Sequence, residues 1–554
     1  MTRRLLSGNE AIALGAFEAG CAVGCGYPGT PSTEIIEALH PYEGVYTEWS
    51  VNEKVALEVG LGACYAGGRA LVTMKHVGVN VAADPLFTAS YTGVNAGLVV
   101  VTADDPSMHS SQNEQDNRHY AVAAKLPMFE PSDSAEARAF TRAAFELSET
   151  FDTPVFLRTT TRLSHSKGIV DADDAAAPAK HPVGFARDAT KYVMIPAHAR
   201  RRRVAVERRM DALAAAVETH PANRVEHAGP EPARVGVITS GVPYTYVKEV
   251  LPDADVLKLG IVHPLPRTLI SEFVANHDVT YVVEELDPVI ETQVRSWGLD
   301  VHGKDVFPAI GEFSPEVLRA SLALPDEAGA ATALPVPPRP PGLCPGCPHG
   351  TVFDALKAKG MLVSGDIGCY TLGVLPPYHV MDAMVDMGAS LTMAQGMDAV
   401  YRSHQGERPK IAAVIGDSTF AHSGLTGLLN AVWNRADGLF IVLDNGTTAM
   451  TGTQPNPLSG ERIGRENSGV LSYPLLAQAV GIPAENVAVV DGNDAAAIGA
   501  AIDDLADRDG VRLLAVVGLC IIEAKELRKI GKYDEKRAWR ELELAAVGSG
   551  ARDE

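Results

Sequence analysis

The stretch KIAAVIGDSTFAHSGL, residues 410–425, decides the fold of the C-terminal part of this chain. The apolar run before Gly416 is typical of a buried strand, and Asp417 follows it directly. The stretch GLFIVLDNGTTAMTG, residues 438–452, repeats this arrangement and places Asn445 after a second apolar run. Such continuous runs predict parallel strands, whose carboxyl ends meet at one edge of an α/β sheet. We therefore expect Asp417 and Asn445 at a ligand-binding sheet edge.

The chemistry of this edge suits a metal-bound diphosphate. Carboxylate, amide and backbone oxygens are hard ligands of the kind that Mg²⁺ takes. Gly416 is expected to let the backbone approach the phosphates closely. Asn445 lies 28 positions after Asp417, and this pair resembles the thiamin diphosphate motif of a Gly-Asp followed by an Asn. The alternative is an ordinary Asp and Asn at two strand ends.

A thiamin enzyme also needs a glutamate that hydrogen-bonds the aminopyrimidine ring and favours its imino form. The stretch TEWSVNEKVALEVGLGACYAGGRA, residues 47–70, supplies Glu53 at the start of a predicted helix rich in small residues. Glu48 and Glu58 compete for the role, and Glu58 is expected on the helix surface. The alternative for Glu53 itself is a solvated helix face.

The length of 554 residues predicts three or four domains. Predicted helices and strands alternate in three parts of the chain. These parts are residues 1–165, 233–325 and 342–522; a connecting segment at 166–232, a Pro-rich linker at 326–341 and a charged tail at 523–554 accompany them. The connecting segment contains an Arg-rich helix, interpreted as a solvated face or a partner contact.

The formal net charge of −21 argues against a nucleic-acid or anionic-membrane partner. Glu10 and Glu18 interrupt any secretory signal, and no apolar window is long enough to span a membrane. Seven cysteines without a signal indicate a reducing compartment, the cytoplasm. Cys21, Cys25 and Cys64 are interpreted as small buried residues.

Eight stretches make the chain resemble the large-subunit family of indolepyruvate:ferredoxin oxidoreductases, in the 2-oxoacid:ferredoxin oxidoreductase superfamily. They follow the family order over nearly the whole chain and are together highly specific. They are LLSGNEAIALGAFEAG (5–20), GYPGTPSTEI (26–35), TMKHVGVNVAADPL (73–86), SSQNEQDNRHYA (110–121), CPGCPHG (344–350), GDIGCYTLGVLPPY (365–378), GDSTFAHSGL (416–425) and DNGTTAMTGTQPNP (444–457).

The resemblance implies a thiamin diphosphate-binding α/β fold with two cofactor-binding parallel-sheet domains. Residues 1–165 would bind the pyrimidine, 342–522 the diphosphate, and 233–325 would form a transketolase-C-terminal-like domain. It implies oxidative decarboxylation of an aryl 2-oxoacid, such as indolepyruvate, to the acyl-coenzyme A, with electrons passed to ferredoxin. The implied cofactors are thiamin diphosphate, Mg²⁺ and a [4Fe–4S] cluster. The implied partners are a small beta subunit, ferredoxin or a ferredoxin-like subunit, and a second copy of the chain.

The resemblance also assigns residues. Glu53 matches the pyrimidine-activating acid, and Asp417, Asn445 and the carbonyl of Thr447 match the Mg²⁺ ligands. Thr30 matches a threonine near cofactor and substrate. The remaining cofactor-site matches are Ile367, Gly368, Cys369, Gly416 and Ser418.

Several other residues are candidates for contact with the substrate. Lys75 and His76 follow the strand RALVTM, and His76 is a catalytic candidate near the thiazolium. Arg118 is a candidate for bidentate binding of the substrate carboxylate, with a structural ion pair as its alternative. The lesser candidates are His109, His119, His379 and His422.

The stretch LCPGCPHG, residues 343–350, contains a CxxC pair, which in a reducing compartment indicates metal or catalysis rather than a disulfide. We expect Cys344 and Cys347 to hold a [4Fe–4S] cluster with Cys369 and Cys520. A structural zinc would use the same four thiolates, and a merely buried pair is the third possibility. Family large subunits commonly end in a ferredoxin-like domain with two cysteine runs, and none follows Cys520 here. Electrons are therefore expected to leave by another route, through a partner subunit.

Two other functions stay open at this point. The first is a non-redox thiamin-dependent 2-oxoacid decarboxylase or carboligase, which would need neither coenzyme A nor an iron–sulfur cluster. The second is a nucleotide- or coenzyme A-binding module with a structural zinc site.

Overall fold

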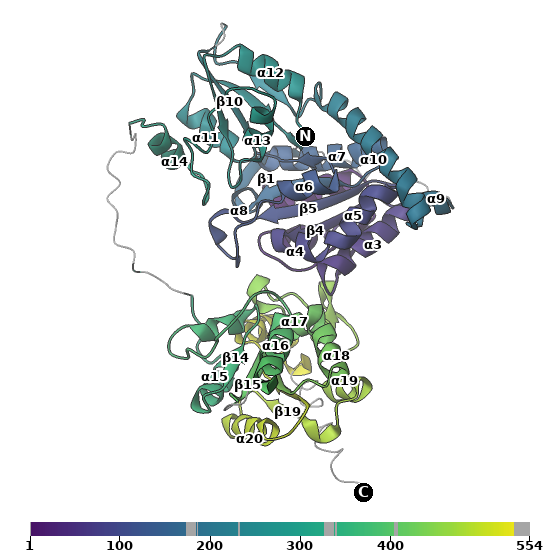
Figure 1. Ribbon diagram of the computed structural model, residues 1–554, viewed down its shortest axis with the longest axis vertical. Helices are drawn as coiled ribbons and strands as arrows, with labels where there is room; N and C mark the ends of the chain where they lie inside the picture. The colour runs from purple at the N-terminus through teal and green to yellow at the C-terminus, as the bar shows by residue number, and fades with distance from the viewer. Residues whose placement is uncertain are drawn as a thin grey trace. The chain divides into compact units, whose positions relative to one another are not determined.

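The structure is a computed structural model, and it describes residues 2–172, 184–185, 187–230, 233–325, 337, 341–403 and 408–536. The chain forms two compact units, Met1–Ala333 and Leu334–Glu554 (Figure 1). Residues 173–183 of the connecting segment, most of the Pro-rich linker at 326–341 and the tail beyond residue 536 lie outside the described residues. Across the described ranges, no helix is both long enough and apolar enough to cross a bilayer.

The first unit is built on a seven-stranded sheet with the order β12-β6-β7-β5-β4-β2-β3. Its strands are β2 (Val23–Gly26), β3 (Tyr46–Trp49), β4 (Ala70–Lys75), β5 (Leu98–Asp104), β6 (Met128–Phe129), β7 (Val155–Thr160) and β12 (Ile261–His263). Neighbouring strands are parallel except for β12 and β6. The predicted strands at RALVTM, GLVVVTAD and PVFLRTT are therefore confirmed.

Helices cover both faces of this sheet, because successive residues of a strand point to opposite sides. Leu71 and Val99 pack in one core with α1 (Gly8–Glu18), α2 (Thr33–Leu39) and α7 (Ser134–Phe151). Val72 and Val100 pack in a second core with α3 (Glu53–Tyr65), α5 (Ala83–Thr92) and α6 (Arg118–Ala124). The helix α4 (His76–Val81) directly follows β4. Cys21, Cys25 and Cys64 are buried in these cores, as expected.

Two strands extend this part of the chain beyond the expected boundaries. β8 (Lys167–Ala172) pairs with β1 (Thr2–Ser7) in an antiparallel ribbon, so ordered structure continues past residue 165. β12 lies in sequence between two strands of the second sheet, β11 (Asp255–Leu259) and β13 (Val279–Val283), but it joins the first sheet through β6. These long-range pairings leave no local sequence signal.

A second sheet in the first unit has the order β13-β10-β11-β9. Its strands are β9 (Arg224–Glu226), β10 (Val235–Ser240), β11 (Asp255–Leu259) and β13 (Val279–Val283), and α11 (Pro243–Val250), α12 (Arg267–Ala275), α13 (Val289–Ser296) and α14 (Pro315–Ser321) accompany them. β10, β11 and β13 coincide with the apolar runs of RVGVITSG, DVLKLG and VTYVVEE, which confirms the alternation of helices and strands predicted for this part of the chain. β9 begins before residue 233 and pairs antiparallel with β11.

The Arg-rich helix is α10 (Pro196–Val217), and it is less solvated than expected. Arg209 is buried and donates to the carbonyl oxygen of Ser90 at 2.7 Å. Arg202 donates to the carbonyl oxygen of Tyr91 at 2.6 Å. Two of its arginines therefore fasten α10 to the end of α5.

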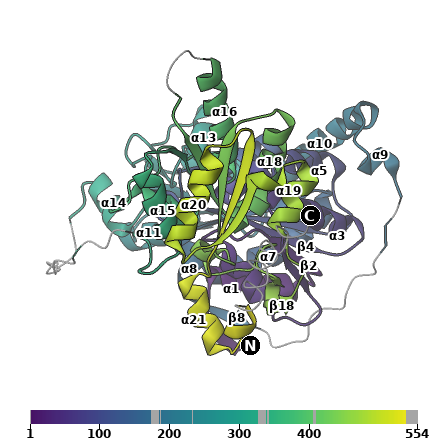
Figure 2. The same cartoon turned by 90° about the horizontal axis from the view of Figure 1, so that it is seen from below.

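The second unit contains a five-stranded parallel sheet with the order β14-β15-β16-β20-β19. Its strands are β14 (Leu362–Ser364), β15 (Ile411–Gly416), β16 (Gly438–Asp444), β19 (Val487–Asp491) and β20 (Val511–Val517). On one face Ala413 and Ile415 pack with α16 (Ala389–Ser403), α18 (Leu425–Trp433) and α19 (Tyr473–Val480). On the other, Ala412 and Val414 pack with α15 (His349–Ala358) and α20 (Ala495–Ala506) (Figure 2). The expected parallel α/β architecture is confirmed.

Candidate functional site

The carboxyl ends of β15 and β16 form the centre of the candidate site in the second unit. The two strands are parallel neighbours, with Gly416 in register with Leu443. Asp417 and Asn445 follow these strand ends and are 2% and 7% exposed. Thr447 is also buried. The strand pairing thus brings the predicted oxygen donors to one sheet edge.

The loop after Asn445 folds back over this edge. Asn456 donates from its side-chain amide to Oδ2 of Asp417 at 3.1 Å. The hydroxyl of Thr448 donates to that of Ser418 at 2.8 Å. The backbone N–H of Thr447 donates to Oδ1 of Asn445 at 3.1 Å. Sequence reasoning missed Asn456, although the stretch TQPNP after the second strand held the signal.

The donor set at this edge fits Mg²⁺ with a diphosphate, because carboxylate, amide and carbonyl oxygens are hard ligands. A Cβ atom at Gly416 would collide with the ring of Tyr370, so the missing side chain makes room for that ring. The close approach of the Gly416 backbone to the phosphates stays a prediction. The Tyr370 hydroxyl in turn donates to the carbonyl oxygen of Ile367 at 2.7 Å.

The DIGC loop contains a buried carboxyl that sequence reasoning did not single out. Asp366 is fully buried and accepts from the backbone N–H groups of Gly388 at 2.9 Å and Ser390 at 3.0 Å. Burial raises the pKa of Asp366 to about 6, and these N–H groups oppose the shift. Asp366 thereby joins the loop at 366–369 to the start of α16.

The four cysteines expected to act together belong to this unit and interact. Burial, followed by the nearby thiols of Cys520, Cys347 and Cys344, raises the pKa of Cys369 to about 12. Burial likewise raises the pKa of Cys347 to about 11, with contributions from Cys520 and Cys344. Among the described residues, no group of three or more His, Cys, Asp or Glu side chains is placed so that it could hold a metal ion. The four thiols thus influence one another electrostatically, but they do not form a metal site in this structure.

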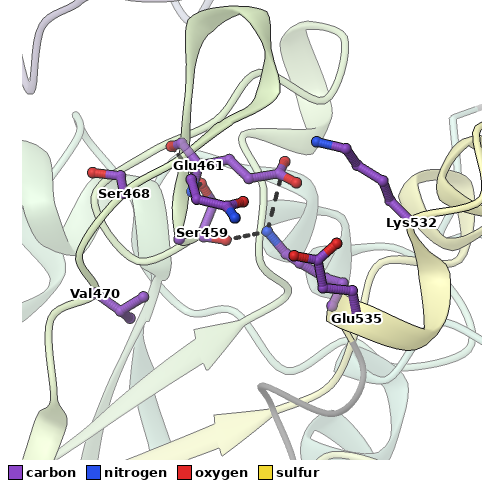
Figure 3. A pocket seen from close by; sticks show the side chains of 9 residues that line it. Ser459, Glu461, Ser468, Val470, Lys532 and Glu535 are labelled. Atoms are coloured by element: carbon purple, nitrogen blue, oxygen red, sulfur yellow. Dashed lines mark hydrogen bonds and ion pairs between the residues drawn. The ribbon is translucent and has the colours of Figure 1, made fainter.

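The helix α21 (Ile521–Lys529) directly follows Cys520. It holds the segment that comes after the loop at 446–456. Arg465 donates to the buried carboxylate of Glu523 at 2.7 Å. Lys532 donates to the carbonyl oxygen of Arg465 at 2.7 Å, and the buried Lys536 donates to that of Ser459. Figure 3 shows the cavity of about 240 Å³ that these lysines line with Glu461, Ser468 and Glu535. The segment around 459–470 is therefore fixed to the C-terminal helices.

Glu53 lies at the start of α3 in the first unit, as predicted. The side chain of Asn52 caps the helix by accepting from the N–H of Val55 at 2.9 Å. Glu53 is 5% exposed, and a Cβ atom at Gly78 would lie 2.6 Å from its Oε1. Glu58 is exposed and pairs with Lys54, whereas Glu48 accepts from Ser50 at 2.7 Å. Of the three glutamates, only Glu53 is buried, which rejects the solvated-face alternative.

Thr30, Lys75 and His76 meet around residues 110–113. Lys75 is 8% exposed and donates to the carbonyl oxygen of Ser110 at 2.6 Å, while the Ser110 hydroxyl is 3.5 Å from the Thr30 carbonyl oxygen. Burial lowers the pKa of Lys75 to about 8, opposed by Asp105. Nε2 of His76 is 3.1 Å from Oδ1 of Asn113, and its Nδ1 has no hydrogen-bond partner among the described residues. Burial, then the charge of Lys75, lowers the pKa of His76.

The substrate-binding role expected for Arg118 does not fit the structure. Its guanidinium is 1% exposed and pairs with Asp116 at 2.6 Å and Glu284 at 2.5 Å. It also donates to the carbonyl oxygens of Glu285 and Asp287. All three guanidinium nitrogens therefore bond to groups of the protein, which favours the structural ion pair over binding of a substrate carboxylate.

The other histidine candidates are dispersed. His109 lies 3.3 Å from a carboxylate oxygen of Glu312, and His119 lies 2.8 Å from one of Asp287; both histidines are exposed. His422 is buried, with Nδ1 2.9 Å from the Ser423 hydroxyl. His379 has a φ of 52° in a loop. The structure does not gather these four around one point within either unit.

Known proteins match the chain along almost its whole length. Indolepyruvate oxidoreductase subunit IorA of Thermococcus kodakarensis is 42% identical over 94% of this chain and 86% of its own length. The chain belongs to this IorA family. The IorA protein of Archaeoglobus fulgidus is 44% identical over 82% of the chain and 77% of its own length.

Two family models locate the cofactor-binding parts. The model "Pyruvate flavodoxin/ferredoxin oxidoreductase, thiamine diP-bdg" matches residues 14–227. The model "Thiamine pyrophosphate enzyme, C-terminal TPP binding domain" matches residues 366–516. These matches confirm the resemblance found in the sequence and the thiamin diphosphate-binding fold. The chain is thus a subunit of a thiamin-dependent 2-oxoacid oxidoreductase.

Proposed function

We propose that this IorA-family chain binds thiamin diphosphate and oxidatively decarboxylates an aryl 2-oxoacid such as indolepyruvate. The products would be CO₂ and the acyl-coenzyme A, and the electrons would pass to ferredoxin. The observation that carries the proposal is the placement of buried Asp417 and Asn445 at neighbouring parallel strand ends. Identity of 42% to an indolepyruvate oxidoreductase subunit supports the choice of substrate.

Asp417, Asn445 and the Thr447 carbonyl would hold the Mg²⁺ ion of the diphosphate. They are buried oxygen donors at one sheet edge, the ligand type that Mg²⁺ takes. Ile367, Gly368 and Cys369 would flank the diphosphate with Ser418. When bound, thiamin diphosphate supplies the electron sink for loss of CO₂.

Glu53 would hydrogen-bond the aminopyrimidine and stabilise its imino form. Its burial against Gly78 restricts the carboxyl to few orientations, which suits a proton-transfer group. Thr30 and His76, joined through residues 110–113, would face the substrate. The unpartnered Nδ1 of His76 supports this role, because a buried polar atom without a partner is costly to retain.

Cys344, Cys347, Cys369 and Cys520 would bind a [4Fe–4S] cluster. Support comes from their mutual effects on thiol pKa and from four soft ligands in one unit. Iron would also replace the protons that the buried thiols otherwise retain, since a coordinating thiol is deprotonated. A small second subunit and a ferredoxin would complete electron transfer, in the cytoplasm.

An anaerobic assay tests the whole proposal. Chain purified without oxygen should be brown, with about four iron atoms per chain by metal analysis. With its second subunit it should reduce a viologen dye, and only when indolepyruvate and coenzyme A are both present. Release of free aldehyde without coenzyme A would indicate the non-redox decarboxylase instead. One zinc per chain and no bound thiamin diphosphate would instead indicate a nucleotide- or coenzyme A-binding module with a structural zinc site.

A further inference from the structure

Asn445 is held by residues that adjoin the cysteines of the proposed cluster. The backbone N–H of Cys520 donates to the carbonyl oxygen of Asn445 at 3.0 Å. On its other side, Nδ2 of Asn445 is 3.4 Å from Nε2 of His349. His349 follows Cys347 by two residues. One proposed Mg²⁺ ligand therefore contacts two segments that carry cluster cysteines.

The hydrogen bond to His349 has a defined direction. The N–H of Thr447 donates to Oδ1 of Asn445 at 3.1 Å, so the oxygen end of the amide faces away from the histidine. The end that faces His349 is the NH₂ group, which can only donate. Nε2 of His349 therefore accepts, and the ring proton sits on Nδ1.

His349 is itself firmly packed. It is 3% exposed and is the first residue of α15. Its ring lies edge-on to Tyr370, with centroids 6.2 Å apart, and Tyr370 directly follows Cys369. Pro348 lies against Gly518, where an added Cβ atom would be 2.7 Å from its own. Tyr370, the neighbour of Cys369, thus packs on His349, and His349 and Cys520 contact Asn445 directly.

We infer that His349 is a positioning residue that couples the four-cysteine site to the diphosphate site through Asn445. By holding Nδ2, it leaves Oδ1 aimed where the metal binds. Assembly of the cluster would fix the segments around Cys347 and Cys520 and so preorder Asn445. Because such coupling is reciprocal, bound cofactor would also stabilise the cluster. The inference rests on the proposed function and adds a link between its two cofactor sites.

The first test measures binding of thiamin diphosphate with Mg²⁺ to anaerobically purified full-length chain by calorimetry. His349→Leu keeps the bulk but removes the acceptor, and should weaken binding about 10- to 100-fold, as loss of groups that orient metal ligands does. His349→Gln restores an acceptor oxygen and should bind within a few-fold of wild type. The matched control is His263→Leu in the first unit, a buried histidine whose ring nitrogens have no hydrogen-bond partner among the described residues. It should leave cofactor affinity unchanged.

The second test measures the coupling itself. Removing iron with a chelator should weaken cofactor binding in wild type, and much less in His349→Leu. Equal affinity of wild type and His349→Leu, or an equal loss on iron removal in both, would overturn the inference. Should His349→Leu fail to fold by circular dichroism, His349→Met takes its place, since its thioether is only a weak acceptor. A wild-type chain that binds neither iron nor thiamin diphosphate would reject the proposed function, and the inference with it.

Discussion

The side-chain amide of Asn456 donates a hydrogen bond to Oδ2 of Asp417, across 3.1 Å. This bond joins two segments that are 39 residues apart. It restrains the rotation of the Asp417 carboxylate. The loop 446–456 thus orients a proposed metal ligand that it does not contain.

Asn456→Ala should therefore weaken binding of Mg²⁺ with thiamin diphosphate about 10- to 100-fold, because a partner that orients a metal ligand is lost. Calorimetric titration of the purified chain measures this. Asn467→Ala, at an exposed asparagine in the same unit, is the control and should bind as wild type does. Unchanged affinity in Asn456→Ala would mean that the Asp417 carboxylate is oriented by other contacts.

Glu53→Gln should lower turnover by about 10²- to 10⁴-fold, because an amide cannot exchange the proton that a carboxyl can. Binding of thiamin diphosphate should persist, since the amide retains the shape of the carboxyl. The matched control is Glu58→Gln on the same helix, where the side chain is exposed and pairs with Lys54. Near-normal turnover in Glu53→Gln would mean that another acid activates the aminopyrimidine.

Arg118→Met should destabilise the first unit by about 3–5 kcal/mol, because Asp116 and Glu284 would be left buried without their cation. Urea unfolding measures this loss. Arg234→Met removes an ion pair whose Arg234 side chain is 88% exposed, and should leave the urea midpoint almost unchanged, because an exposed ion pair is screened by solvent. If Arg118→Met instead raised the KM for the 2-oxoacid without loss of stability, the arginine would belong to the substrate site after all.

The stability of the first unit should depend on Glu285. Burial raises the pKa of Glu285 to about 7, above its ordinary value near 4.5. At pH values between these two pKa values, the folded state binds more protons than the unfolded state. The free energy of unfolding therefore falls as pH rises, by on the order of 1–3 kcal/mol at pH 8. Glu285→Gln should remove this loss, because the amide oxygen can still accept from the N–H of Phe313.

The measurement is the urea midpoint at pH 5 and pH 8 for wild type and Glu285→Gln. The two proteins should be alike at pH 5, and the variant should be more stable at pH 8. Glu249→Gln, at an exposed glutamate of α11, should change neither value. A variant that is less stable than wild type at pH 8 would show that the ionised carboxylate is favourably paired.

The local pattern of the sequence predicts the helices and strands, and it places several of the proposed site residues at their ends. The apolar runs before Asp417 and Asn445 could only be buried strands, and parallel pairing then brings their ends together. Glu53 was likewise found from its place at a helix start, which Asn52 caps. Such features depend on residues close in the chain, so the sequence carries them directly.

Tertiary packing decided what residues far apart in sequence do to one another. Arg118 had the chemistry of a carboxylate binder, but Glu284, 166 residues away, neutralises it. Gly416 also makes room for the ring of Tyr370, a contact that the sequence around Gly416 does not indicate. The roles proposed for His349 and Asn456 depend on the folded chain, which places these side chains against Asn445 and Asp417. Charge neutralisation and exclusion of volume act through space, and the sequence alone does not specify which distant side chain will be near.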